Sequence, residues 1–103
     1  MSDSEPDEFY YDIQDETIKE AFDELPFMTE VFRNPLYDIK KSVDSDIDFL
    51  LGAVIQRIIG HSSLLYFTRK ARTPTKEQYV KLNYRLFSRA SEFREKILKI
   101  VGS

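Results

Sequence analysis

The chain has 103 residues, a formal net charge of -3 and no cysteine. This length suits one domain with a single hydrophobic core. The absence of cysteine excludes disulfides, thiolate metal sites and a cysteine nucleophile, and it favours a cytoplasmic setting.

The N-terminal part combines an acidic stretch with a first helical pattern. Residues 1–9 are rich in Ser, Asp and Glu, so we expect a disordered acidic tail before a single all-α domain over residues 10–103. Apolar residues at helical spacing predict a first helix from Asp12 or Asp15. Pro26 is predicted to end this helix, because proline has no backbone N–H to donate to the carbonyl four residues before it.

The segment after Pro26 predicts only short helical pieces. The stretch "PFMTEVF" is followed by "PLYDIKKSV", for which Asn34 is a suitable N-cap and Pro35 a suitable first-turn residue. We expect two or three short helices in this N-terminal region.

Two long helices are predicted in the rest of the chain, over residues 46–71 and 76–101. The second begins at a capping box formed by Thr75 and Gln78. Their similar lengths and the short link between them favour a long antiparallel hairpin. The predicted fold is therefore an all-α helical bundle, built on this hairpin with the short N-terminal helices packed on it.

The helix over residues 46–71 is apolar on two sides, and a helix of this kind is covered by more than one neighbour. One side continues the core pattern. The other combines large and small residues, and small residues allow a second backbone to come close. We expect this second stripe to be a helix-packing or oligomer interface, for a second copy or another protein: Phe49, Ala53, Gly60, Leu64 and Phe67.

Charge is divided unevenly between the two halves of the chain. Residues 1–49 hold 15 acids and 4 bases, a net of -11, whereas residues 50–103 hold 3 acids and 11 bases, a net of +8. Such a division indicates a basic binding surface, or two halves that attract each other when folded. The inner face of the last predicted helix is widened by Val80, Tyr84, Phe87 and Leu98 into an apolar arc of about 200°, more than one neighbour would cover. Arg94 falls within this arc, where it is a candidate for an ion pair with the first half or for the lining of a partner site.

A basic row at the hairpin corner and along the last helix is the candidate surface for nucleic acid. Its phosphate contacts would weaken with salt, and Tyr66, Phe67 and Tyr79 would stack on bases if exposed. The row consists of Arg69, Lys70, Arg72, Lys76, Lys81, Arg85 and Arg89.

No motif predicts catalysis or ligand binding. "DSDID" at 44–48 lacks the glycine and the glutamate of a calcium loop, because Phe49 and Ile55 occupy those positions. His61 is the only histidine, and no nucleophile lies three or four residues from it. We therefore expect no catalytic, metal-binding or cofactor-binding residues and no small-molecule ligand. Arg57 and His61 also interrupt the most apolar run, so no membrane span is expected.

The sequence thus predicts a non-enzymatic small helical module for protein–protein interaction or self-association. Nucleic-acid binding through the basic row remains the alternative.

Overall fold

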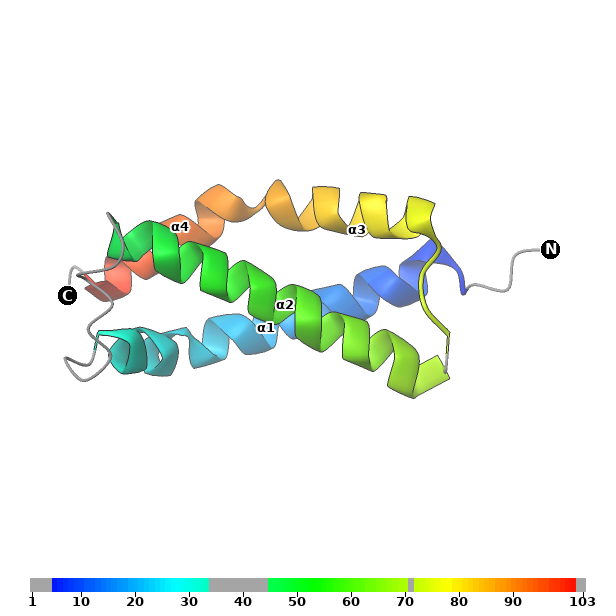
Figure 1. The fold of residues 1–103 in the computed structure, drawn as a ribbon, viewed down its shortest axis with the longest axis horizontal. Coiled ribbons are helices and arrows are strands. Elements are labelled where there is room, and N and C mark those ends of the chain that lie inside the picture. The colour runs from blue at the N-terminus through cyan, green and yellow to red at the C-terminus, as the bar shows by residue number, and fades with distance from the viewer. Residues whose placement is uncertain (1–4, 34–44, 71, 102–103) are drawn as a thin grey trace.

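The computed structural model describes residues 5–33, 45–70 and 72–101, which form four helices that pack together (Figure 1). Helix α1 spans Asp7–Phe32, α2 Asp46–Lys70, α3 Lys76–Phe87 and α4 Ala90–Val101. No strand occurs within the described residues. The predicted all-α class is therefore confirmed.

Helix α1 begins at Asp7, earlier than the sequence predicted. Residues 7–9 were predicted to belong to a disordered tail, but they are helical. The first turns of α1 carry an apolar side chain that packs in the core. Tyr10 is fully buried, and its ring meets the ring of Tyr66 edge to face with centroids 5.2 Å apart. Aromatic pairs in this geometry stabilise a fold beyond the area that they bury. Residues 1–4 lie outside the described part of the chain.

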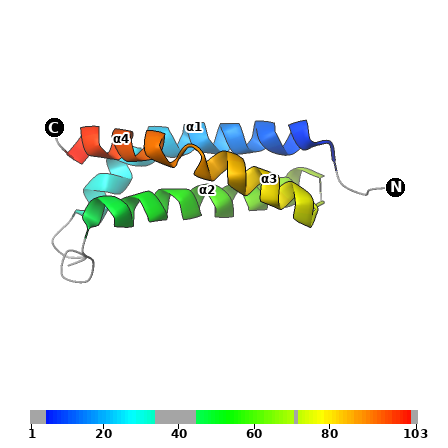
Figure 2. The same cartoon turned by 90° about the horizontal axis from the view of Figure 1, so that it is seen from above.

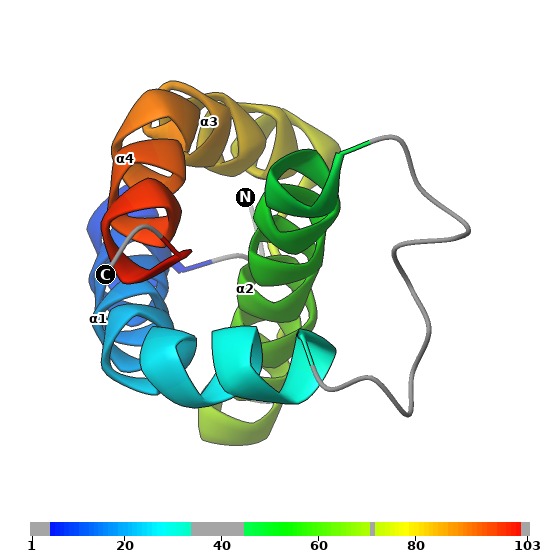
Figure 3. The same ribbon diagram turned by 90° about the vertical axis from the view of Figure 1, so that its left-hand side faces the viewer.

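The prediction that Pro26 ends the first helix is wrong, since α1 continues to Phe32. An interior proline costs about 3 kcal/mol. Apolar side chains continue the buried side beyond it, however, and the Phe32 ring packs on Phe49 with centroids 5.4 Å apart. Packing thus outweighs the local preference. In Figure 3 the last part of α1 (cyan) turns toward α2, as expected of a helix that bends at a proline.

Helix α2 begins where the sequence predicted. The Ser45 side-chain oxygen accepts a hydrogen bond from the backbone N–H of Asp48 (3.2 Å), and Asp46 and Asp48 occupy the first turn. Both features stabilise the positive end of the helix dipole. Ala71, the predicted last residue, and the predicted helical turns at 35–43 lie outside the described residues.

The predicted last helix is divided into α3 and α4 at Ser88 and Arg89. Its start is as predicted, with the Thr75–Gln78 capping box in place. At the break, the Arg89 N–H bonds to the carbonyl of Leu86 (3.0 Å), and the Ser88 hydroxyl donates to the carbonyl of Arg85 (2.7 Å). The side chain thus replaces the regular backbone donor, which often bends helices. Neither proline nor glycine marks this position in the sequence.

The chain runs along α1, reverses into α2 and returns through α3 and α4 (Figures 1 and 2). Its principal extents are 52 × 24 × 23 Å. The prediction of only short helices in the N-terminal region is wrong for α1. This helix has 26 residues and is at least as long as α2, which has 25. The main core is shared by all four helices and contains Ile18, Ala21, Leu25, Leu50, Val54, Ile58, Leu86, Phe93 and Ile97.

Candidate interaction face

The predicted interface stripe of α2 is only partly covered. Phe49, at its N-terminal end, packs against Phe32 of α1 and is half-buried, as is Ala53. Toward the C-terminal end Gly60 is exposed, and the side chains of Leu64 and Phe67 are 58% and 55% exposed. The structure therefore leaves the C-terminal half of the stripe open to solvent.

The stripe was also predicted to hold a second backbone close to its small residues. A Cβ atom built on Gly60 meets no heavy atom of its surroundings within 4 Å, and the same holds for Gly52, which lies outside the stripe on the same helix. The fold of one chain therefore makes no use of the small size of these glycines.

Helix α3 adds exposed apolar residues that the sequence analysis placed in an inner arc. The side chains of Val80, Tyr84 and Phe87 are 63%, 76% and 52% exposed. They lie at positions i, i+4 and i+7, so they share one side of α3. Leu82 and Leu86 are the residues that this helix buries. The apolar arc of the predicted last helix was wider than one neighbouring helix can cover. This width was the sequence signal that part of the arc would remain exposed.

These exposed residues of α2 and α3 flank the contact between the two helices. Ser63 of α2 and Asn83 of α3 line the same small hollow, of about 10 Å³, together with Gln14 of α1, so both lie on the sides by which α2 and α3 approach each other. Residues three before and four after a given residue are its neighbours on a helix surface. Gly60 and Phe67 are those neighbours of Ser63, and Val80 and Phe87 those of Asn83. We define the α2–α3 face as Gly60, Leu64, Phe67, Val80, Tyr84 and Phe87.

The basic row lies opposite acids of α1. The Arg69 guanidinium donates two hydrogen bonds to the Glu16 carboxylate, at 2.8 and 3.0 Å. These bonds lower the pKa of Glu16 and raise the pKa of Arg69. A two-point contact of this kind holds both charged groups in fixed orientation.

A second group of contacts joins the start of α3 to the start of α1. The Gln78 amide donates to Asp7 (3.0 Å), and Lys81 Nζ approaches the same carboxylate at 3.2 Å. Two hydrogen bonds lower the pKa of Asp7. The larger effect comes from Gln78 and the smaller from Lys81. Arg72 contacts Glu5 at 3.4 Å. The predicted corner is therefore linked to the N-terminal end of α1.

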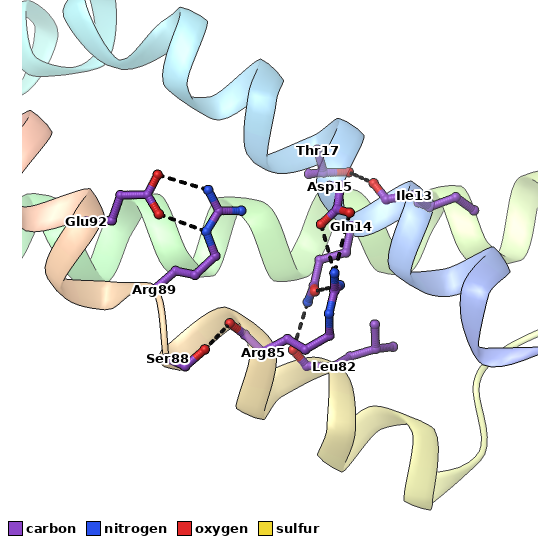
Figure 4. Close-up of polar contacts among 9 residues, drawn as sticks. All are labelled: Ile13, Gln14, Asp15, Thr17, Leu82, Arg85, Ser88, Arg89 and Glu92. Atoms are coloured by element: carbon purple, nitrogen blue, oxygen red, sulfur yellow. Dashed lines mark hydrogen bonds and ion pairs between the residues drawn. The ribbon is translucent and has the colours of Figure 1, made fainter.

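Arg85 contacts three residues of α1, and Figure 4 shows its contacts with Gln14 and Asp15. Its guanidinium donates to Gln14 Oε1 at 2.7 Å and to Asp15 at 3.1 Å, and it lies 4.2 Å from the centroid of the Tyr11 ring. The buried Gln14 in turn donates to the carbonyl of Leu82 (2.8 Å). Helix α3 is thereby fixed to α1 by a chain of polar contacts.

The remaining members of the row differ from one another. Arg89 forms two hydrogen bonds with Glu92, at 2.9 and 3.0 Å (Figure 4), which lower the pKa of Glu92. Lys76 is exposed and has no ion pair within the described residues, and the side chain of Lys70 lies outside them. Tyr66, proposed to stack on bases, is buried, and burial raises its pKa. It is therefore not available to a base.

Within the described residues, two more ion pairs cross between helices, and a histidine lies beside a carboxylate. Arg94 of α4 contacts Asp48 of α2, an acid of the first half, although its side chain is largely exposed rather than held in an apolar arc. Arg57 contacts Glu24, and His61 Nδ1 lies 3.4 Å from Glu20. The acids of the first half thus meet the bases of the second half along the whole bundle.

A further hollow of about 300 Å³ lies between α1 and α4. Phe22, Leu25 and Ile100 form its apolar part, and Lys96 and Glu95 are among its charged residues. No group of three metal-binding side chains comes together in the described ranges.

By length and composition Asp46–Arg69 could cross a membrane, with a mean hydropathy of 1.3. This is weak ground for a span, because a core helix has the same properties, and Leu50, Val54 and Ile58 of this helix are buried in the bundle.

No protein-family model, no curated protein and no solved structure matches the chain.

Proposed function

We propose that this chain is a non-enzymatic interaction module that binds another protein surface through the α2–α3 face. The observation that carries the proposal is the exposure of five large apolar side chains on that face: Leu64, Phe67, Val80, Tyr84 and Phe87. Soluble proteins keep few large apolar patches in contact with water, and those that persist are often binding sites. In this proposal α2 and the α3–α4 arm act as an antiparallel hairpin that presents the face.

The composition of the face also supports binding to protein. It combines aromatic and aliphatic side chains with a glycine and contains no charged residue. Interface centres are depleted in charge and enriched in aromatic residues in this way. The other large exposed apolar residues in the described ranges, Phe27 and Leu98, lie on α1 and α4.

Nucleic-acid binding is placed second. Five of the seven residues of the basic row contact an acid: Arg69, Arg72, Lys81, Arg85 and Arg89. A phosphate would have to displace a carboxylate at each of these positions. Less positive charge is therefore available to a polyanion than the sequence suggests.

Photo-crosslinking in cells tests the proposal. A photoreactive benzophenone analogue of phenylalanine replaces Phe67 in the α2–α3 face and, as a matched control, Phe27 of α1, which is more exposed still (69% against 55%). We expect protein adducts from position 67 and none from position 27. An absence of adducts at position 67, in a variant that folds normally by circular dichroism, would overturn the proposal.

A further inference from the structure

A strip along the outward side of α2 lacks charge over five turns. In a chain that is 32% charged, this uncharged strip consists of Phe49, Ala53, Gln56, Gly60, Leu64 and Phe67, of which the first two are half-buried. The exposed Arg57 lies beside the strip and contacts Glu24 of α1. Where two copies of one surface meet across a two-fold axis, a residue near the axis faces its own copy. A charge there would oppose an identical charge. An uncharged strip is therefore suited to meet itself.

Gly60 provides an independent observation. Glycine in the middle of a helix lowers stability relative to alanine. A Cβ atom at position 60 would meet nothing within 4 Å, as at position 52, so packing within the chain gives no reason for glycine at either position. Of the two, Gly60 lies in the uncharged strip. A second helix backbone that approaches closely at this point would give such a reason.

We propose that a second copy of the chain covers the α2–α3 face, with the two α2 helices antiparallel and crossing at Gly60. This proposal rests on the proposed function, since it names the partner of the same face. Antiparallel pairing about position 60 brings together residues whose numbers add to 120. Phe67 then lies opposite Ala53 of the partner subunit, so a large side chain meets a small one on both sides of the axis.

The exposed side of α3 extends the same contact. Val80 and Phe87 are exposed and are helix-surface neighbours of Asn83, which lines a common hollow with Ser63 of α2, so they flank the strip that the partner would occupy. The partner α2 would then lie beside both helices and bury the apolar residues of each.

Disulfide trapping tests the crossing point, because the chain has no cysteine of its own. In Gly60→Cys the new thiol lies on the axis beside its own copy, and we expect a covalent dimer on mild oxidation. Gly52→Cys is the matched control, since it also introduces the side chain into open space on α2. Position 52 lies about 12 Å from the crossing and about 24 Å from its copy, beyond the Cα separation of about 7 Å that a disulfide spans. We therefore expect it to form no disulfide-linked dimer.

Sedimentation velocity of the unmodified chain over a range of concentrations tests self-association without any added cysteine. We expect a concentration-dependent dimer, and we expect Phe67→Glu to raise its dissociation constant at least about thirtyfold. Phe27→Glu on α1 should leave the constant unchanged. A dimer that survives Phe67→Glu, or one in which Gly60→Cys forms no disulfide, overturns the proposed packing.

Failure of this proposal and failure of the proposed function give different results. If the chain remains a monomer while position 67 captures an adduct of another mass, the second copy is wrong and the interaction face stands. If the chain is a monomer and position 67 captures nothing, both are wrong. An adduct of twice the chain mass supports both.

Discussion

Two threonines of α1 are equally buried but differ in hydrogen bonding. Thr17 and Thr29 are each 2% exposed. The Thr17 hydroxyl donates to the carbonyl of Ile13 at 2.9 Å, whereas the Thr29 hydroxyl has no partner in the part of the chain described by the structure. A buried hydroxyl without a partner loses its hydrogen bonds to water and receives nothing in exchange. Thr29 therefore lowers the stability of the bundle.

We expect Thr29→Val to raise the free energy of unfolding by about 1–2 kcal/mol, because a methyl group replaces an unpaired hydroxyl of the same shape. Thr17→Val is the matched control and should lower it by about 1 kcal/mol, since it removes a hydrogen bond. Urea unfolding at one fixed protein concentration measures both. Changes of the same sign in the two variants would contradict this explanation.

At the scale of the helices, α3 is held to α1 largely by polar contacts. It buries only Leu82 and Leu86 among the described residues. Lys81 and Gln78 bind Asp7, and Arg85 binds Asp15. The attachment of α3 therefore depends on ionised carboxylates.

This dependence predicts a loss of stability in acid. The pKa of Asp7 is lowered by Gln78 and Lys81, and the pKa of Glu16 is lowered by Arg69. Each carboxyl therefore binds its proton more weakly in the folded than in the unfolded state. The stabilisation is present above the unfolded pKa of about 4 and is lost as the pH falls through the lowered folded value.

We expect the free energy of unfolding to decrease as the pH falls from about 4.5 toward 2.5. The decrease should be shallower in Asp7→Asn and in Glu16→Gln. Glu8→Gln removes an exposed carboxylate of the same helix that has no ion pair within the described ranges, and it should follow the unmodified chain. Denaturant titrations at a series of pH values measure all four proteins. Identical slopes in all of them would contradict the role of these contacts.

Local signals predicted the helix ends that depend on neighbouring residues in the sequence. The start of α2 at Asp46 and the Thr75–Gln78 capping box are of this kind, because each end is stabilised by side chains within one turn. The continuation through Pro26 was missed, since it depends on packing that begins with Phe32 on Phe49. The break at Ser88 was missed as well. This break changes the direction of the helix, so that α3 makes its polar contacts with α1 while α4 packs against α2.

The same distinction applies to the α2–α3 face. Helical spacing alone was enough to define the stripe of α2 that contains Gly60, because its residues all lie on one helix. The structure shows that only the C-terminal half of this stripe is exposed. Assigning Val80, Tyr84 and Phe87 to the face required the position of α3 relative to α2. Spacing showed only that the apolar arc was wide, and the three-dimensional arrangement determined which part of it was buried.

At the scale of the whole molecule, the opposite charges of the two halves lie on facing helices. Arg69 meets Glu16, and Arg85 meets Asp15. The pairs are largely exposed, and exposed pairs contribute little stability individually. Their larger effect is on the field around the molecule, because the acids of α1 neutralise the row that would otherwise attract a polyanion.

Oligonucleotide titrations test this effect directly. We expect fluorescent single-stranded and duplex oligonucleotides not to bind the unmodified chain, even at low salt where electrostatic attraction is strongest. Neutralising three acids that face the row, by Asp7→Asn, Asp15→Asn and Glu16→Gln together, should release three cations and produce binding. For three phosphate contacts on duplex DNA, log K should fall with log salt with a slope of about -3.

A change of net charge alone would also favour a polyanion, so the control must carry the same charge. Asp12→Asn, Asp23→Asn and Glu30→Gln together remove three acids of α1 that have no ion pair within the described residues. This variant should remain unbound at low salt, because its basic row is still neutralised. Equal binding by the two triple variants would show that net charge alone limits association. Binding by the unmodified chain would restore the basic row as a nucleic-acid site, with Lys76, which has no ion pair in those residues, as the first position to substitute.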